Sequence, residues 1–337
     1  MPNPTASFTS RVLIVAAVVL LGLLAWRLVD LIALVFGAIV AAVALRSLAT
    51  WLERRARVPR KLSVLTAVLL IIGLLVAIGM VVGQPLAEQV ELLRARLPQA
   101  WNQFIVWLGS HRIGVAVIQF WQETRGDGVP WARLASFAGL TLGALGSFGL
   151  MLVIAIFLAA EPQTYHVGFL RLMPPTQRAR IDEALRSAGN GLRGWLKGQA
   201  LSMLYVGTTT TIGIAALGAP LALALGLVNG LLAFVPYIGA IGGGLLAVVV
   251  AFIEGPRTAL YVALLMVAIQ QIESHVVQPL VQKWAVSLPP VLGLVAAVVF
   301  GVLFGVLGVL LATPLMVVTM VLVQRLYIEG VLERAGP

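Results

Sequence analysis

Long apolar runs separated by short polar links dominate the chain. Two of them, 220–253 and 290–323, are too long for one straight crossing of a bilayer, since a helix of about 34 residues extends roughly 50 Å and the hydrocarbon core is roughly 30 Å thick. The other six runs come closer to the length that one crossing helix needs, roughly 20 residues. They are 12–26, 28–45, 62–82, 137–160, 200–217 and 259–273. The pattern predicts an all-α, polytopic helical membrane protein with about eight transmembrane segments.

Both of the longest runs are interrupted by residues that break helices. The first contains Pro236-Tyr237-Ile238-Gly239 and then Gly242-Gly243-Gly244, and the second contains Gly301, Gly305, Gly308 and Pro314. Each is predicted to form two helical pieces, either as a re-entrant hairpin or as a kinked full crossing. With the span before each of them, they suggest an inverted repeat in a transport core at 199–323. Paired interruptions of this kind indicate a transporter binding site, and the alternative is a pair of kinked helices without a site.

Residues 84–136 are too polar to cross a membrane. Their apolar residues recur at steps of three and four, which predicts an amphipathic helix. These residues are Leu86, Val90, Leu93, Leu97, Trp101, Phe104 and Leu108. We expect a small extracytoplasmic helical insert packed on the membrane domain. A partner-binding groove is the alternative.

Charge gives the expected orientation. The 23 Lys and Arg residues outnumber the 13 Asp and Glu residues, for a net charge of +10. Such an excess in a soluble protein suggests nucleic acid, but here basic residues gather in links at 46–61 and 163–199, as they do in cytoplasmic loops. We expect cytoplasmic termini, transmembrane helices 1 to 3 within 1–83, a fourth span with its basic connection at 137–198, a cytoplasmic tail at 324–337, and no nucleic-acid partner.

Composition and motifs exclude several other classes. With 60% hydrophobic and 11% charged residues, the chain does not fit a soluble domain, in which roughly a quarter of residues are charged. Cysteine is absent, which excludes disulfides and cysteine-based metal sites. No phosphate-binding loop, H-E-x-x-H or G-x-S-x-G sequence occurs. We therefore expect no enzyme activity, no cofactor, no metal site and no ATP-driven transport.

A polar stretch follows the run at 259–273. Gln271, His275, Gln278 and Gln282 are spaced so that they share one face of a helix, while Gln270 and Ser274 lie on the adjacent face with Glu273 between. Pro279 has no N–H and would leave a carbonyl without its helical partner. The stretch is predicted to line a solute path, with Glu273 or His275 as candidate proton or cation carriers. A solvated helix end is the alternative.

The candidate site combines the interruptions with this polar stretch. Free backbone groups cost several kcal/mol if they face lipid, so an interruption is expected to face protein or water. The candidate solute-binding residues are Asn229, Pro236, Tyr237, Gly239, Gln270, Gln271, Glu273, Gly305 and Gly308, and the candidate gate or hinge residues are Gly242, Pro279 and Pro314. For the glycines alone, close helix packing is the alternative.

Several short sequences, taken together, resemble the autoinducer-2 exporter family of bacterial permeases. They are Leu-Arg-Gly-Trp-Leu-Lys-Gly-Gln at 192–199, Leu-Gly-Ala-Pro at 217–220, Phe-Val-Pro-Tyr-Ile-Gly at 234–239, Ile-Gln-Gln-Ile-Glu at 269–273, Gln-Pro-Leu-Val at 278–281, Phe-Gly-Val-Leu-Gly at 304–308 and Thr-Pro-Leu at 313–315. Ala240 stands where the family commonly has proline. The resemblance implies a multispan permease of the bacterial inner membrane, a homo-oligomer such as a pentamer, and a small furanosyl signalling molecule as cargo, although some members resemble sodium/proton antiporters.

The sequence therefore favours an exporter of a small polar solute that works by alternating access, with its site between the two interrupted segments. One alternative is a sodium or other cation/proton antiporter that uses Glu273 as the exchanging carboxylate. The other is a membrane scaffold or assembly protein that acts through 84–133.

Overall fold

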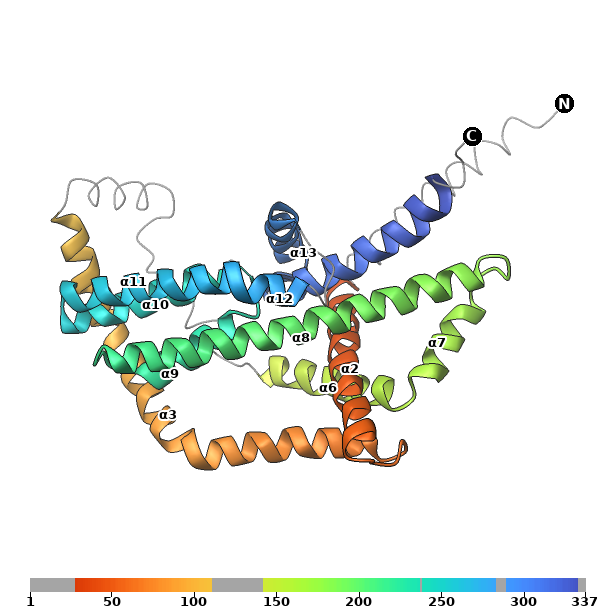
Figure 1. Ribbon diagram of the computed structural model, residues 1–337, viewed down its shortest axis with the longest axis horizontal. Helices are drawn as coiled ribbons and strands as arrows, with labels where there is room; N and C mark the ends of the chain where they lie inside the picture. The colour runs from red at the N-terminus through yellow and green to blue at the C-terminus, as the bar shows by residue number, and fades with distance from the viewer. Residues whose placement is uncertain (1–27, 111–141, 237, 283–288, 333–337) are drawn as a thin grey trace.

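The computed structural model describes residues 28–110, 142–236, 238–282 and 289–332, and all regular structure in these ranges is helical (Figure 1). The predicted all-α class is confirmed. The first predicted crossing, 12–26, lies outside the described residues. So do 111–136 of the insert, 137–141 at the start of the fourth predicted span, and Tyr237.

Within the described ranges, four segments are long and apolar enough to cross a membrane. They are 31–55 in α2 (Val29–Arg55), 63–80 in α3 (Ser63–Gly109), 256–280 starting with α11 (Pro256–Ile272), and 291–329, which spans α13 (Pro290–Val323) and part of η3 (Gln324–Leu332). α6 (Leu142–Ala160) and α7 (Pro162–Arg171), bent by 87° at their junction, make a fifth if they count as one span. These helices are those of a polytopic membrane protein, and the total of eight crossings stays a prediction.

The third predicted span and the start of the insert form one helix. α3 runs from Ser63 to Gly109 and contains Pro85 and Pro98. A proline inside a helix removes one backbone hydrogen bond, and the change of direction along α3 in Figure 1 is its expected effect. The apolar stripe of the insert packs inward, because Leu86, Leu93, Leu97 and Phe104 belong to or contact the core cluster around Val250 and Phe252.

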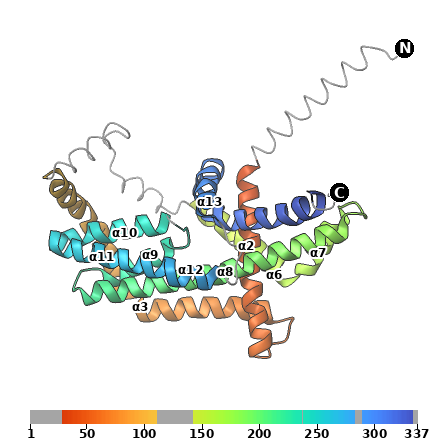
Figure 2. The ribbon, with the colours of Figure 1, turned by 45° about the horizontal axis from the view of Figure 1, so that its top comes forward.

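α8 (Arg178–Ala216) is the longest straight element and joins two predicted regions. The basic connection at 163–199 and the span at 200–217 were expected as separate regions, but 178–216 form one continuous helix. Figures 1 and 2 show α8 running through the middle of the molecule, beside α11 and α9 (Ala222–Leu232), and it contacts both. At its beginning, His166 of α7 and Arg186 hydrogen-bond the Asp182 carboxylate and lower its pKa.

The run at 220–253 is interrupted as predicted. α9 ends at Leu232, and α10 (Ile238–Ala251) then doubles back along it before the short turn η1 (Phe252–Glu254). A side chain at Gly239 would overlap the carbonyl of Leu232, and one at Gly243 would overlap Asn229. Position numbers rise along one helix as they fall along the other, so α9 and α10 form an antiparallel hairpin. α10 passes through Gly242 without a break, and a hinge at this residue stays a prediction.

The run at 290–323 also doubles back. Gly305 has φ 60° and ψ −140°, which no helical residue adopts, and it divides α13 into two arms. A side chain at Gly308 would overlap the carbonyl of Phe300, and Ala296 and Ala297 of the first arm cluster with Ala312 of the second. The structure thus has hairpins at both predicted interruptions, and their placement in a bilayer stays a prediction.

Candidate functional site

A cavity of about 310 Å³ lies where α8, the α9/α10 hairpin and the end of α11 meet. Its polar side chains come from Asn229 of α9 and from the end of α11 and the residues after it, and apolar side chains lie between them. The lining residues are Val206, Asn229, Ala233, Val235, Pro236, Ala240, Met266, Ile269, Gln270, Glu273, Ser274 and Gln278. Four predicted site residues therefore face one space: Asn229, Pro236, Gln270 and Glu273.

Glu273 is the only buried carboxylate among the described residues, with a relative exposure of 8%. Ser202 of α8 donates its hydroxyl hydrogen bond to Oε1 of Glu273, and Gln270 donates from Nε2 to Oε2 at 3.1 Å. No Lys, Arg or His in the described residues forms an ion pair with it. Burying a charge without an opposite charge is expensive, so such a carboxylate is typical of a functional site rather than of a stabilising contact.

Asn229 fixes the opposite wall of the cavity. It is 4% exposed, and its Nδ2 lies 3.4 Å from both Thr210 Oγ1 of α8 and Met266 Sδ of α11. Its side chain fits because Gly243 of α10 has no Cβ. Asn229 thus contacts two other helices and also lines the cavity.

The polar stretch after α11 has a different register from the one predicted. Residues Glu273–Val277 form η2, a π-helical turn in which the N–H of Gln278 bonds the carbonyl of Glu273, followed by α12 (Gln278–Gln282). The wider turn inserts one residue and rotates the following positions. Gln270, Glu273, Ser274 and Gln278 consequently share the cavity face, and the predicted grouping of Gln271, His275 and Gln278 is wrong.

The remaining predicted residues lie elsewhere. Gln271 and His275 are exposed and pair with each other, His275 Nδ1 lying 2.9 Å from the carbonyl oxygen of Gln271. Gly305 and Gly308 shape the turn of the α13 hairpin and do not line the cavity, contrary to the expectation of a site between the two hairpins.

The predicted gate and hinge residues also lie outside the cavity lining. Gly242 is exposed on α10, Pro279 is exposed on α12, and Pro314 is fully buried inside the second arm of α13. Gly239 is buried at the crossing of α9 and α10, beside the cavity and not in its lining.

Three functional candidates on α8 were missed. Gln199, Ser202 and Thr210 are buried polar residues, and Gln199 donates from Nε2 to the carbonyl of Ala233, where α9 ends. This bond satisfies a carbonyl that the interruption sets free. Together with the apolar Val206 between them, the three polar residues are spaced by three and four positions and so share one face of α8. This spacing was readable in the sequence.

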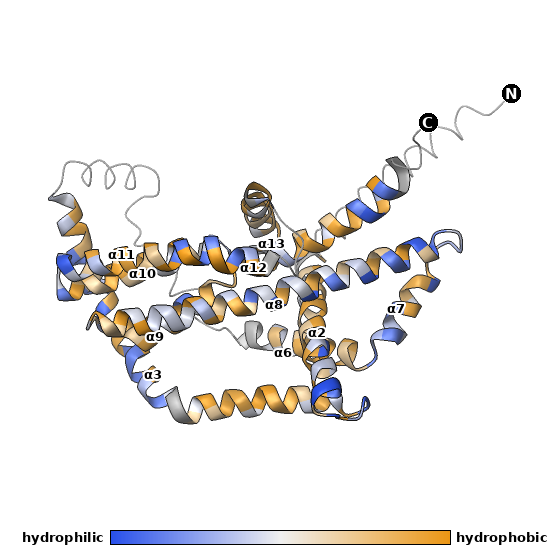
Figure 3. Cartoon of the chain, in the orientation of Figure 1, coloured by the Kyte–Doolittle hydropathy of each residue, from blue (hydrophilic) through white to orange (hydrophobic). Residues whose placement is uncertain are grey.

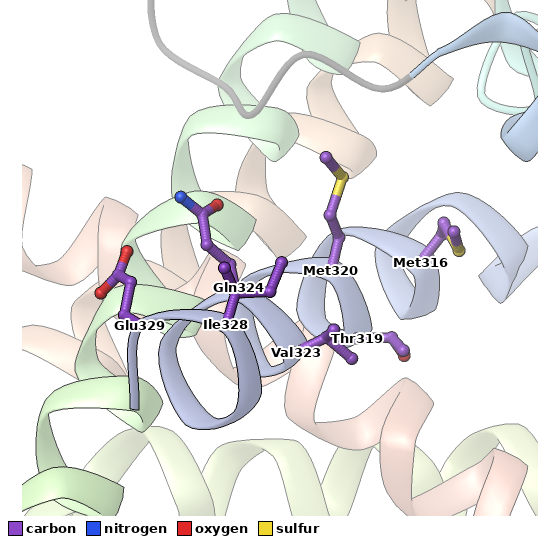
Figure 4. A pocket seen from close by; sticks show the side chains of 7 residues that line it. All are labelled: Met316, Thr319, Met320, Val323, Gln324, Ile328 and Glu329. Carbon is purple, nitrogen blue, oxygen red and sulfur yellow. The ribbon is translucent and has the colours of Figure 1, made fainter. Parts of the chain in front are cut away.

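A second hollow, of about 460 Å³, lies along the last turns of α13 and η3 (Figure 4). It is lined by Met316, Thr319, Met320, Val323, Gln324, Ile328 and Glu329. All of them come from one continuous stretch of chain, and most are apolar. It lacks the convergence of polar groups from several helices that marks the first cavity.

Comparison with known proteins shows which family and which relatives this sequence resembles. The sequence matches the model of the family described as "AI-2E family transporter" over residues 13–328. It is 26% identical over 242 residues to "Putative transport protein YueF" of Bacillus subtilis (strain 168), an alignment that covers 67% of this chain and 65% of that protein.

A second relative, "Putative transport protein MT0215" of Mycobacterium tuberculosis (strain CDC 1551 / Oshkosh), is 34% identical over 170 residues, with 47% of this chain and 46% of that protein covered. The chain thus spans less than two thirds of the length of either relative. The family match, in contrast, extends over nearly the whole chain and includes every helix around the polar cavity. The chain belongs to the AI-2E transporter family.

Proposed function

We propose that the chain is a secondary transporter that exports a small polar solute, with the cavity around Asn229 and Glu273 as its binding site. The observation that carries the proposal is the buried Glu273 carboxylate, held by a hydroxyl and an amide and without an ion-pair partner in the part of the chain that the structure describes. Ionisable groups in such surroundings mark substrate and ion pathways in membrane proteins.

The lining favours neutral solutes with several hydroxyl groups. Glu273 accepts hydrogen bonds, Asn229, Gln270 and Gln278 can donate and accept, and no basic side chain among the described residues lines the cavity to neutralise an anion. An anionic solute would meet repulsion from Glu273 at short range in a region of low dielectric constant. A furanosyl signalling molecule has the favoured chemistry, and pockets for such ligands begin at roughly 300 Å³.

The two hairpins suggest how access alternates. Each turns at residues without regular helical hydrogen bonding, and discontinuous helices of this kind commonly surround transporter sites. Movement of the α9/α10 hairpin against α8 would shift Asn229 and Pro236 relative to Glu273 and open the cavity to one side at a time. The Gly305 turn would act as the hinge of the second hairpin.

A second candidate is a sodium or other cation/proton antiporter. The absence of a cation beside Glu273 favours it, because a carboxylate that exchanges a proton for a metal cation must be free of a permanent partner. In both candidates, transport is driven by an ion gradient or runs passively, and ATP is not involved. We further propose the bacterial inner membrane, cytoplasmic termini and a homo-oligomer as the setting.

Flux measurements with the purified full chain in sealed vesicles test the proposal. The substitution Glu273→Gln should lower efflux of a neutral polyhydroxylated solute by roughly tenfold or more, because the charge and its acceptor capacity are lost. The matched control is Glu183→Gln, an exposed carboxylate on α8. Equal flux in wild type and Glu273→Gln would reject the site.

The same vesicles separate the two candidates. Proton movement driven by a sodium gradient in the absence of any organic solute, and lost in Glu273→Gln, would favour the antiporter. Solute flux that persists without any cation gradient would favour passive export.

A further inference from the structure

The link between α2 and α3 carries a dense group of free cations, here called the basic link: Arg54, Arg55, Arg57, Arg60 and Lys61. There is no acidic residue between positions 54 and 61. All five side chains are exposed, and none forms an ion pair or a hydrogen bond within the described part of the chain. Figure 3 shows this link as a hydrophilic spot between two strongly apolar helices.

The nearest acid cannot neutralise the basic link. Glu53 Oε1 lies 3.1 Å from Arg46 Nη2 and accepts a hydrogen bond from Ser63 Oγ at 2.6 Å. This closed network ties the last turn of α2 to the first turn of α3. The five cations on the outside therefore remain without a counter-charge.

The link is also held in a defined shape. The N–H of Ala56 bonds the carbonyl of Leu52, and the N–H of Leu62 bonds the carbonyl of Pro59. Below the link, Ala49 and Leu52 of α2 pack with Val64 and Ala67 of α3 and with α6. Less conformational entropy is lost when a ligand binds cations that are displayed on an ordered turn.

Exposed apolar residues flank the cations on both sides. Trp51, just before the link, is 57% exposed, and Leu62 and Leu65, just after it, are 52% and 56% exposed. Tryptophan is enriched at the boundary between membrane and water, and the stretch 31–55 that ends at the link is a candidate span. A nucleic acid or an acidic protein would match the charge alone, whereas a phospholipid matches both the charge and the apolar flanks.

We propose that the basic link is a binding site for the headgroups of anionic phospholipids, with Trp51 and Leu62 in contact with their acyl chains. Clusters of four to eight basic residues next to a membrane helix bind anionic lipids in this way. The site is separate from the polar cavity and does not depend on what the cavity carries.

Lipid retention by the purified full chain tests the site. The protein is exchanged into mixed micelles that contain equal amounts of phosphatidylglycerol and phosphatidylcholine, and bound lipids are counted by native mass spectrometry. Wild type should be enriched in phosphatidylglycerol, and the variant R54Q/R55Q/R57Q/R60Q/K61Q should lose that enrichment by roughly tenfold or more. The matched control is R94Q/R96Q, which removes two exposed cations of α3 away from the link and should retain the enrichment.

Two further measurements keep the outcome decisive. The variant R54K/R55K/R57K/R60K keeps every charge and should bind as wild type does. If the neutral variant unfolds, this variant still shows whether positive charge at the link is what binds the lipid. Millimolar inorganic phosphate should not displace the lipid. No preference in wild type, equal loss in the control variant, displacement by free phosphate, or selective retention of nucleic acid in place of lipid would each overturn the proposal.

Discussion

The two hairpins of this protein have similar backbones and different surroundings. In the α9/α10 hairpin, Asn229 and Pro236 face a cavity that Glu273 of η2 enters from outside the hairpin. In the α13 hairpin, the facing residues are Ala296, Ala297 and Ala312, with Phe300 and Met316 around them. Gly239 in one hairpin and Gly308 in the other leave no room for a side chain, but polar side chains of a separate helix, Gln270 and Glu273 among them, line a cavity beside the α9/α10 hairpin.

The difference shows that a helix interruption does not make a site by itself. At the α9/α10 turn, the freed carbonyl of Ala233 is bonded by Gln199 from α8, and the adjoining cavity is lined by polar side chains at the end of α11 and just after it. A hairpin needs such neighbours before its exposed backbone can serve a solute. The polar neighbours, not the glycines, therefore distinguish the hairpin that we propose to bind solute from the other one.

The largest expected effect tests what the hairpins share. Gly239→Ala would overlap the carbonyl of Leu232, and Gly308→Ala would overlap the carbonyl of Phe300. Overpacking against backbone costs about 3 kcal/mol or more, since backbone cannot swing aside as a side chain does. Both variants should unfold at clearly lower temperature in detergent, as followed by circular dichroism.

Gly242→Ala is the control for this pair. Gly242 lies inside α10 with open space where its Cβ would stand, and alanine is favoured over glycine in a helix by about 1 kcal/mol. This variant should be as stable as wild type or more so. If Gly239→Ala behaves like Gly242→Ala, the close approach of α9 and α10 is not present in the protein.

The next effect concerns the turn of the apolar hairpin alone. Gly305→Ala meets no atom within 4 Å, but φ 60° with ψ −140° is a backbone conformation that is nearly restricted to glycine. The expected loss is about 2 kcal/mol of unfolding free energy, measured by denaturant titration. The polar cavity should keep its solute affinity, because no α13 residue lines it. A loss of solute affinity with unchanged stability would show that the α13 hairpin takes part in solute binding.

The hairpins also show what the sequence could and could not predict. Pro236, Gly239 and Gly305 mark the turns directly, because only proline and glycine interrupt apolar runs of this kind. The identity of the cavity wall could not be read in the same way. Its register depends on the π-helical turn at Glu273, and that turn depends on packing between helices that are far apart in sequence.

The same limit explains the residues that were missed. Ser202 and Gln199 bond to groups 71 and 34 positions away along the chain. Local periodicity places them on one face of α8 but does not say what that face meets. Asn229 could be predicted because an isolated polar residue in an apolar run is informative without knowledge of its partner. Glu273 could be predicted because an ionisable residue at the end of a candidate membrane span is informative in the same way.

A smaller effect tests the polar neighbours of the α9/α10 hairpin. Ser202→Ala removes the hydroxyl that hydrogen-bonds Glu273, and a hydrogen bond to a charged group contributes about 1.5–3 kcal/mol. Solute flux in vesicles should fall by roughly tenfold, and the unfolding temperature should fall as well. Thr208→Ala on the same helix is the control, because the Thr208 hydroxyl bonds only carbonyls of its own helix. Equal flux in the two variants would contradict a role for α8 in the site.

The smallest expected effect concerns the beginning of the α9/α10 hairpin, where a side chain of α3 hydrogen-bonds the first turn of α9. Gln89 Oε1 accepts hydrogen bonds from the N–H groups of Leu223 and Ala224, both at 3.1 Å, and so caps α9 with a side chain from another helix. No corresponding cap on α13 is present among the described residues. Loss of a helix cap costs about 1 kcal/mol, so Gln89→Ala should lower stability by that amount and speed amide hydrogen exchange at Leu223 and Ala224.

Gln89→Glu separates the cap from ordinary packing of this side chain. It keeps the acceptor and places a negative charge at the positive end of α9, where an acidic group is favourable by about 0.3–1 kcal/mol. Exchange at Leu223 and Ala224 should therefore return to the wild-type rate, although the donor half of the Gln89 amide is lost. If Gln89→Glu exchanges as fast as Gln89→Ala, the hairpin is anchored by the apolar stripe of α3 and not by this cap, and the two hairpins then differ only in the polar groups beside their turns.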